Sequence, residues 1–117
     1  MSANLMPGDD WVPAACTLPT VEQPLRRAEF DALFADDVLA VARESSQQLR
    51  LELRADPDVA ARAAGLAAKE TGCCSFFTFE LVMTGGEVTL TISTAPTHEP
   101  VLDALAARAE SRLGAGA

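Results

Sequence analysis

Basic residues are scarce in this chain, where nine Lys and Arg stand against 17 Asp and Glu and give a formal net charge of −8. No basic cluster is longer than the doublet Arg26-Arg27. Proteins that bind nucleic acid or anionic lipid headgroups attract the phosphates with clustered Lys and Arg, and an acidic surface repels them. We therefore expect neither nucleic acid nor a membrane surface as a partner.

Long apolar segments are also absent. A helix needs about 20 consecutive apolar residues to span a bilayer, and no stretch of this sequence approaches that length. The first 13 residues contain neither the basic start nor the apolar run that is typical of a signal peptide. These features predict a cytoplasmic protein.

Cysteine is rare and unevenly placed, at Cys16, Cys73 and Cys74. An odd number with two adjacent members is unlike the framework of a secreted disulfide domain. A bridge within the adjacent pair would be strained, because Cα atoms across a trans peptide lie about 3.8 Å apart and disulfides prefer about 4.4–6.8 Å. We interpret all three residues as reduced thiols.

Several motifs that would identify an activity are missing as well. The sequence has no glycine-rich phosphate loop, no H-E-x-x-H and no G-x-S-x-G. It also lacks the C-x₂-C spacing of structural zinc sites. Any chemical site must therefore be sought in the unusual Cys73-Cys74 pair and its surroundings.

The length and composition predict a single globular domain. The chain has 117 residues, 49% of them hydrophobic and 22% charged, which suffices for one buried core. Residues 1–24 are rich in proline and lack periodicity, so we expect an extended N-terminal arm followed by one α+β domain over residues 25–117.

Hydrophobic periodicity predicts three helices and two hairpins in this domain. Helices are expected over 25–35, 57–71 and 98–113, with Gly72 ending the second and Thr97 capping the third. Residues 76–83 and 88–94 predict one β-hairpin, and residues 49–54 alternate strictly as a strand does. The segment 38–43 is ambiguous, and we favour a first hairpin with 49–54 over a continued helix. The doublet Asp36-Asp37 is expected to be solvated. The order, a helix followed by ββαββα, predicts a four-stranded, mainly antiparallel sheet with helices on one face.

A two-residue turn at Gly85-Gly86 would fix the register of the second hairpin. It sets apolar residues opposite one another on one face of the sheet: Met83 with Val88, Leu81 with Leu90, and Phe79 with Ile92. Continued beyond the strands, the same register places His98 opposite Cys73. The second helix should therefore end close to the only histidine of the chain.

Glu70 is predicted to accompany the cysteines. Its spacing from Val59, Ala63 and Leu66 places it on the core side of the second helix. Two thiols, a carboxylate and an imidazole could bind a soft or borderline ion such as Zn(II), Cu(I), Hg(II) or trivalent arsenic. The expected ligands are Cys73, Cys74, Glu70 and His98, and Cys16 would add a third sulfur if the arm folds back.

Metal-free alternatives remain open. Cys73 follows a helix C-terminus in an acidic protein, where the field favours the neutral thiol, so metal binding ranks above unaided nucleophilic attack. An enzyme that exchanges thiols would use Cys73, Cys74 and Glu70 as its catalytic residues. An interaction or ligand-binding domain would only pack its cysteines in the core. A small thiophilic molecule as ligand and a homodimer are both compatible with the sequence.

The motif E-x-x-C-C-x-F-F at residues 70–77, together with the segment A-C-T-L-P-T-V-E-Q-P-L-R at 15–26, resembles a family of small uncharacterised bacterial proteins that are frequent in actinobacteria. The resemblance extends from Trp11 to Arg108. It implies that the glutamate and the double cysteine are the signature, that the early cysteine recurs, and that some members accompany mercury- or metal-responsive regulators. The residue types are also similar to those of the organomercurial lyases, which use two cysteines and an acidic residue. This similarity implies an enzyme that cleaves a carbon–metal bond, with Cys73 or Cys74, Cys16 and Glu70 in those roles. We therefore expect a role in heavy-metal resistance or sensing.

Overall fold

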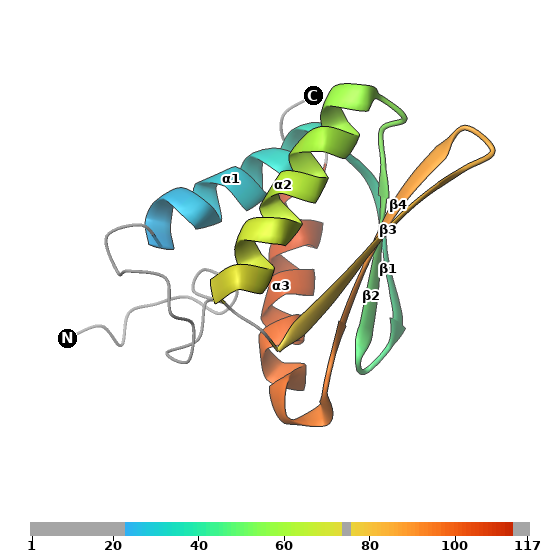
Figure 1. The fold of residues 1–117 in the computed structure, drawn as a ribbon. Helices are drawn as coiled ribbons and strands as arrows, with labels where there is room; N and C mark the ends of the chain where they lie inside the picture. Colours follow the sequence, from blue (N-terminus) through green and yellow to red (C-terminus); the bar gives the residue numbers. More distant parts are fainter. Residues whose placement is uncertain (1–22, 74–75, 114–117) are drawn as a thin grey trace.

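The computed structural model describes residues 23–73 and 76–113 (Figure 1). Helices and hairpins alternate along this part of the chain. The elements are α1 (Gln23–Asp36), β1 (Val38–Ser45), β2 (Gln48–Leu53), α2 (Pro57–Cys73), β3 (Phe77–Thr84), β4 (Glu87–Thr94), the 3₁₀ turn η3 (Pro96–His98) and α3 (Glu99–Arg112). The predicted α+β class and the order ββαββα behind a first helix are confirmed. The arm predicted over residues 1–24 lies, up to residue 22, outside the described residues.

The four strands form one antiparallel sheet in the order β1-β2-β4-β3. Each hairpin therefore contributes its second strand to the centre and its first strand to an edge. All three helices lie on the same side of the sheet, which Figure 1 shows almost edge-on. Among the described residues, no helix combines the length and the apolar character needed to cross a membrane.

The register of the second hairpin is the predicted one. Gly85 and Gly86 form the turn with φ angles of 58° and 80°, the left-handed values that a type I′ turn requires and that glycine adopts without steric cost. All three predicted pairs are present: Met83 with Val88, Leu81 with Leu90, and Phe79 with Ile92. Because side chains alternate along a strand, this register turns one complete apolar face towards the helices.

The core lies between that face and the helices. Leu49, Leu51 and Leu53 of β2 lie opposite the apolar residues of β4, and all three are at most 3% exposed. The helices contribute a second set of buried apolar residues: Phe30, Leu33, Phe34, Val59, Ala63, Leu66, Leu102, Leu105, Ala106 and Ala109. Burial of this apolar area is the main favourable contribution to folding.

Two predicted helix boundaries are wrong. Gly72 does not end α2, which continues through Cys73; a glycine costs only about 1 kcal/mol relative to alanine within a helix, so it weakens a helix without having to stop it. Thr97 does not cap α3. It lies in η3, and His98 occupies the N-cap position without a side-chain capping bond. Pro96 begins η3 and Pro100 lies in the first turn of α3, positions that suit the fixed φ angle of proline.

Asp37 was expected in solvent, and this expectation is also wrong. The residue is 6% exposed and lies at the junction of α1 and β1. Its Oδ2 accepts a hydrogen bond from Arg62 Nη1 of α2 at 2.5 Å, and Arg54 Nε lies 4.0 Å from Oδ1. A buried carboxylate needs such compensation, and here the cations come from distant parts of the sequence.

We expect Leu51→Ala to lower the free energy of unfolding by about 2–5 kcal/mol, because it removes a fully buried side chain from the centre of the sheet and leaves a cavity. Leu39→Ala is the matched control, since Leu39 is 61% exposed and should change stability by no more than about 0.5 kcal/mol. Urea denaturation followed by circular dichroism measures both. Similar losses for the two variants would contradict the core described above.

Candidate functional site

Glu70 is the buried carboxylate at the C-terminal end of α2. It is 1% exposed, and Val59, Ala63 and Leu66, which share its face of the helix, are 5%, 0% and 3% exposed. These residues recur at helical spacing, so a single stripe of α2 faces the sheet. The prediction that Glu70 points towards the core is confirmed.

The thiols predicted to surround Glu70 are Cys73, Cys74 and Cys16. Helix α2 runs through Cys73, which therefore follows Glu70 by three residues. Positions three apart in a helix are neighbours on one face, so the backbone places Cys73 one turn beyond Glu70 on the same side of α2. The side chain of Cys73 and all of Cys74 and Cys16 lie outside the described part of the chain.

His98 lies at the open end of the second hairpin, opposite the turn at Gly85-Gly86. Its ring stacks on Phe76, with centroids 4.2 Å apart and planes inclined by 8°. Thr97 Oγ1 lies 3.2 Å from His98 Nδ1, and Thr94 Oγ1 donates a hydrogen bond of 3.4 Å to the carbonyl oxygen of Phe76. The paired strands end at Phe77 and Thr94, so the imidazole is adjacent to the segment that leads from α2 into β3.

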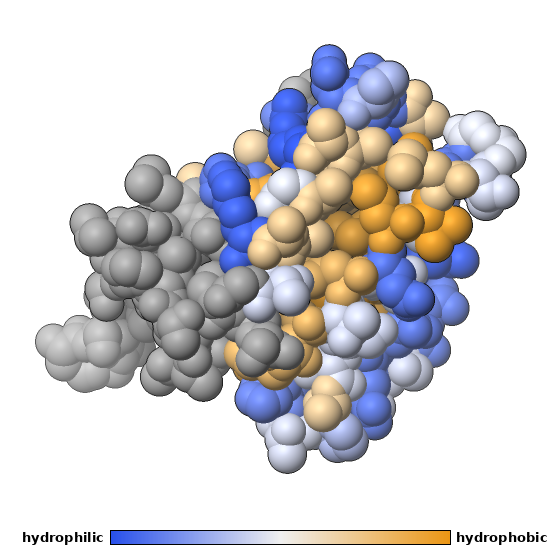
Figure 2. Space-filling view, in the orientation of Figure 1, coloured by the Kyte–Doolittle hydropathy of each residue, from blue (hydrophilic) through white to orange (hydrophobic). Residues whose placement is uncertain are grey.

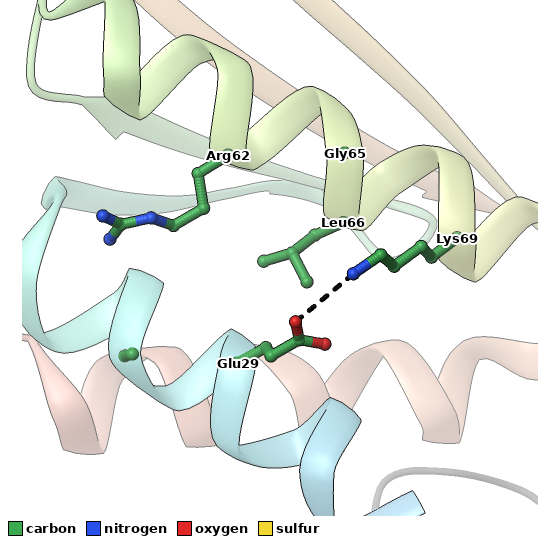
Figure 3. A pocket seen from close by; sticks show the side chains of 6 residues that line it. Glu29, Arg62, Gly65, Leu66 and Lys69 are labelled. Atoms are coloured by element: carbon green, nitrogen blue, oxygen red, sulfur yellow. Dashed lines mark hydrogen bonds and ion pairs between the residues drawn. The ribbon is translucent and has the colours of Figure 1, made fainter. Parts of the chain in front are cut away.

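The charges near this end of α2 do not favour a thiolate. The last turn of α2 contains no basic residue, and the C-terminus of a helix carries partial negative charge. The basic residue nearest to Cys73 in the sequence is Lys69. Its Nζ lies 3.4 Å from Glu29 Oε2 of α1, and Figure 3 shows the side chain reaching across to that helix. The described charges at this end of α2 therefore supply no positive field that would favour a thiolate.

A groove between α1 and α2 was not predicted from the sequence. Its volume is about 350 Å³, and its lining consists of Glu29, Ala32, Arg62, Gly65, Leu66 and Lys69 (Figure 3). Its charged groups already pair, Lys69 with Glu29 and Arg62 with Asp37. It contains neither Glu70 nor His98, so it is separate from the candidate site.

An ion pair that joins α3 to α1 was also not predicted from the sequence. Arg108 donates from Nε and Nη2 to the two carboxylate oxygens of Asp31, at 2.8 and 2.6 Å. Such a bidentate pair fixes the relative position of two planar groups. The two residues are far apart in the sequence. Nothing near either of them distinguishes it from an ordinary solvent-exposed charged residue, so the sequence does not predict the pair.

The described side chains alone do not form a metal site. Within residues 23–73 and 76–113, no group of three His, Cys, Asp or Glu side chains is arranged to hold an ion. This part of the chain includes the side chains of Glu70 and His98 but none of the three thiols. Glu70 and His98 could therefore contribute to a site only together with ligands from the cysteines.

Comparison with known proteins gives no assignment, since no protein-family model, no curated protein and no solved structure matches the chain.

Proposed function

We propose that this protein binds a soft metal or metalloid ion through Cys73, Cys74 and Cys16, with Glu70 and His98 as secondary contributors, in heavy-metal resistance or sensing. The observation that carries the proposal is the position of Glu70. It is a carboxylate with 1% exposure, one helical turn before the cysteine pair.

A buried carboxylate favours positive charge nearby. Charges interact more strongly in a protein interior, where the effective dielectric constant is lower than in water. A divalent or trivalent ion bound by neighbouring thiolates would supply positive charge on the same face of α2. Glu70 would then balance part of the charge of the ion, in a place from which water is excluded.

The electrostatics of α2 favour metal-bound thiolates over reactive free ones. A helix C-terminus without a basic residue in its last turn does not stabilise a thiolate. A thiophilic ion displaces the thiol proton when it binds, so it needs no prior ionisation. The same helix end that argues against an unaided nucleophile is compatible with a metal ligand.

His98 has the support that a ligating imidazole usually has. Histidine ligands are commonly oriented by a second contact at the ring nitrogen that does not bind the ion. The contact of Thr97 with Nδ1 and the stacking on Phe76 orient the ring in this way. Nε2 is then the atom that would coordinate the ion.

The cysteine spacing favours Hg(II), trivalent arsenic or Cu(I) over Zn(II). Structural zinc sites need four ligands in a tetrahedron and usually separate paired cysteines by two to four residues. Ions that accept linear or trigonal thiolate coordination make smaller demands. A site of this kind requires reduced thiols, which the cytoplasm maintains.

We expect one equivalent of Hg(II) or arsenite to remain bound in native mass spectrometry of the reduced full-length chain. The double variant Cys73→Ser/Cys74→Ser should lose this adduct, because the thiolates supply most of the binding energy. Ser111→Cys on the unmodified chain is the control for nonspecific capture, since its added thiol is exposed on α3 and should not raise the affinity for the first equivalent. No stoichiometric adduct, or one unchanged in the double variant, would rule out the site.

Glu70→Gln distinguishes binding from catalysis. If Glu70 only balances charge, the variant should still bind the ion about tenfold more weakly, the lower range for a supporting residue of a metal site. If the protein cleaves a carbon–mercury bond, the Glu70 carboxyl would give its proton to the leaving carbon as the mercury passes to two thiolates. Release of hydrocarbon from an organomercurial, followed by gas chromatography, would then be lost in Glu70→Gln. Glu110→Gln, at an exposed position of α3, should change neither property.

A further inference from the structure

The two edges of the sheet are built differently. At one edge, the pairing of β1 with β2 shifts register twice, between Val38 and Ala40 and between Arg43 and Ser45. At the other edge, all eight residues of β3 pair with β4 without a shift. Irregular pairing is a common means of keeping an edge strand from pairing with another chain. The edge at β1 has this protection and the edge at β3 does not.

Strand β3 also exposes apolar side chains on both of its faces. Four large hydrophobic residues of the described chain are exposed, and two of them belong to β3: Val82 at 48% and Met83 at 61%. The strand contains neither proline nor a basic residue, and its one charge is Glu80. In Figure 2 the pale orange of α2 passes into deeper orange towards the β3–β4 hairpin. The apolar surface therefore extends beyond the strand itself.

The flank of α2 that continues this surface consists of small residues. Arg62, Gly65 and Lys69 line the groove towards α1. Helical spacing places Ala60, Ala64 and Ala67 on the opposite flank. Ala60 is partly buried against the core, and α2 packs against β3, so the flank away from α1 lies towards the strand. Alanines at such positions let a second helix approach closely.

The hairpin geometry shows which backbone groups of β3 face outwards. In a two-residue hairpin the pair that flanks the turn, here Thr84 with Glu87, is hydrogen-bonded, and such pairs recur at every second residue. The even-numbered residues of β3 therefore direct their N–H and C=O groups at β4. Those of the odd-numbered residues from Phe77 to Met83 point away from it, as a row of donors and acceptors that another strand could use.

We propose that β3 pairs antiparallel with β3 of a second copy of this chain, with Leu81 opposite Leu81 of the second copy, so that two four-stranded sheets join into one. This register brings the outward backbone groups of the two strands together. It also sets Phe79 opposite Met83 of the second copy on the helix side, where the alanine flanks of the two α2 helices adjoin.

The position of Glu80 favours this register over the alternative one, and it favours a second copy of the chain as the partner of β3. Two registers align all but one residue of each strand. One sets Glu80 opposite Glu80, and like charges directly opposite each other destabilise a sheet. The other sets Glu80 opposite Val82, so that no two charges of the strands face each other. Self-complementarity of this kind is what a two-fold interface requires.

The experiment is sedimentation velocity of the reduced full-length chain over a concentration series, with charge placed at position 82. We expect a reversible dimer. Val82→Glu should raise its dissociation constant about tenfold, because it creates two Glu–Glu pairs across the two-fold axis. Val82→Lys should leave the dimer intact or tighten it, since each lysine would face Glu80. Glu80→Lys combined with Val82→Glu should restore wild-type affinity.

Leu39→Glu is the matched control, because Leu39, 61% exposed against 48% for Val82, lies on β1 at the opposite edge; it should leave the dimer unchanged. Circular dichroism checks that each variant is folded. A wild-type chain that stays monomeric at high concentration would overturn the proposal. In that case residues 1–22 of the same chain, or a different peptide, would be the occupant of the β3 edge. A dimer that responds equally to Val82→Glu and Val82→Lys, or that Leu39→Glu disrupts, would overturn it as well.

Discussion

Strands β2 and β4 lie side by side at the centre of the sheet, and their pairing joins two hairpins that each form from neighbouring residues. Leu49, Leu51 and Leu53 lie opposite Ile92, Leu90 and Val88. A slip of one residue in this pairing would turn three leucines towards solvent. The position of every helix depends on this register, because the helices pack on the face of the sheet that the register makes apolar.

The helices tie the two halves of the chain together. Helix α2 follows the first hairpin but packs against β3 of the second, and α3 follows the second hairpin but also contacts β1 and β2 of the first. Helix α1 packs on α3, where Arg108 binds Asp31. Each half therefore covers the other. The second hairpin, which α2 precedes and His98 follows, brings the end of α2 to the same end of the sheet as His98.

Local sequence signals predicted most of the fold and part of the site. The turn at Gly85-Gly86 specifies its own register, and the spacing of Glu70 from Val59 depends on a single helix, so both could be derived from neighbouring residues. The solvated position expected for Asp37 was wrong because its partner Arg62 comes from another element. The wrong boundary at Gly72 has a related cause, since packing along α2 outweighs a weak local preference. The position of Cys16 relative to Cys73 and Cys74 also depends on contacts between distant parts of the sequence, so local signals do not predict it.

The position of β4 between β2 and β3 also sets an order of folding. Each hairpin closes over a short loop and can form within microseconds. The pairing of β2 with β4 must instead enclose α2 and β3, so the chain loses more conformational entropy before the leucine rows meet. Closure of the centre should therefore be the slow step. The end of α2 and His98 are brought to one end of the sheet before that step, by the second hairpin alone, because they directly flank β3 and β4.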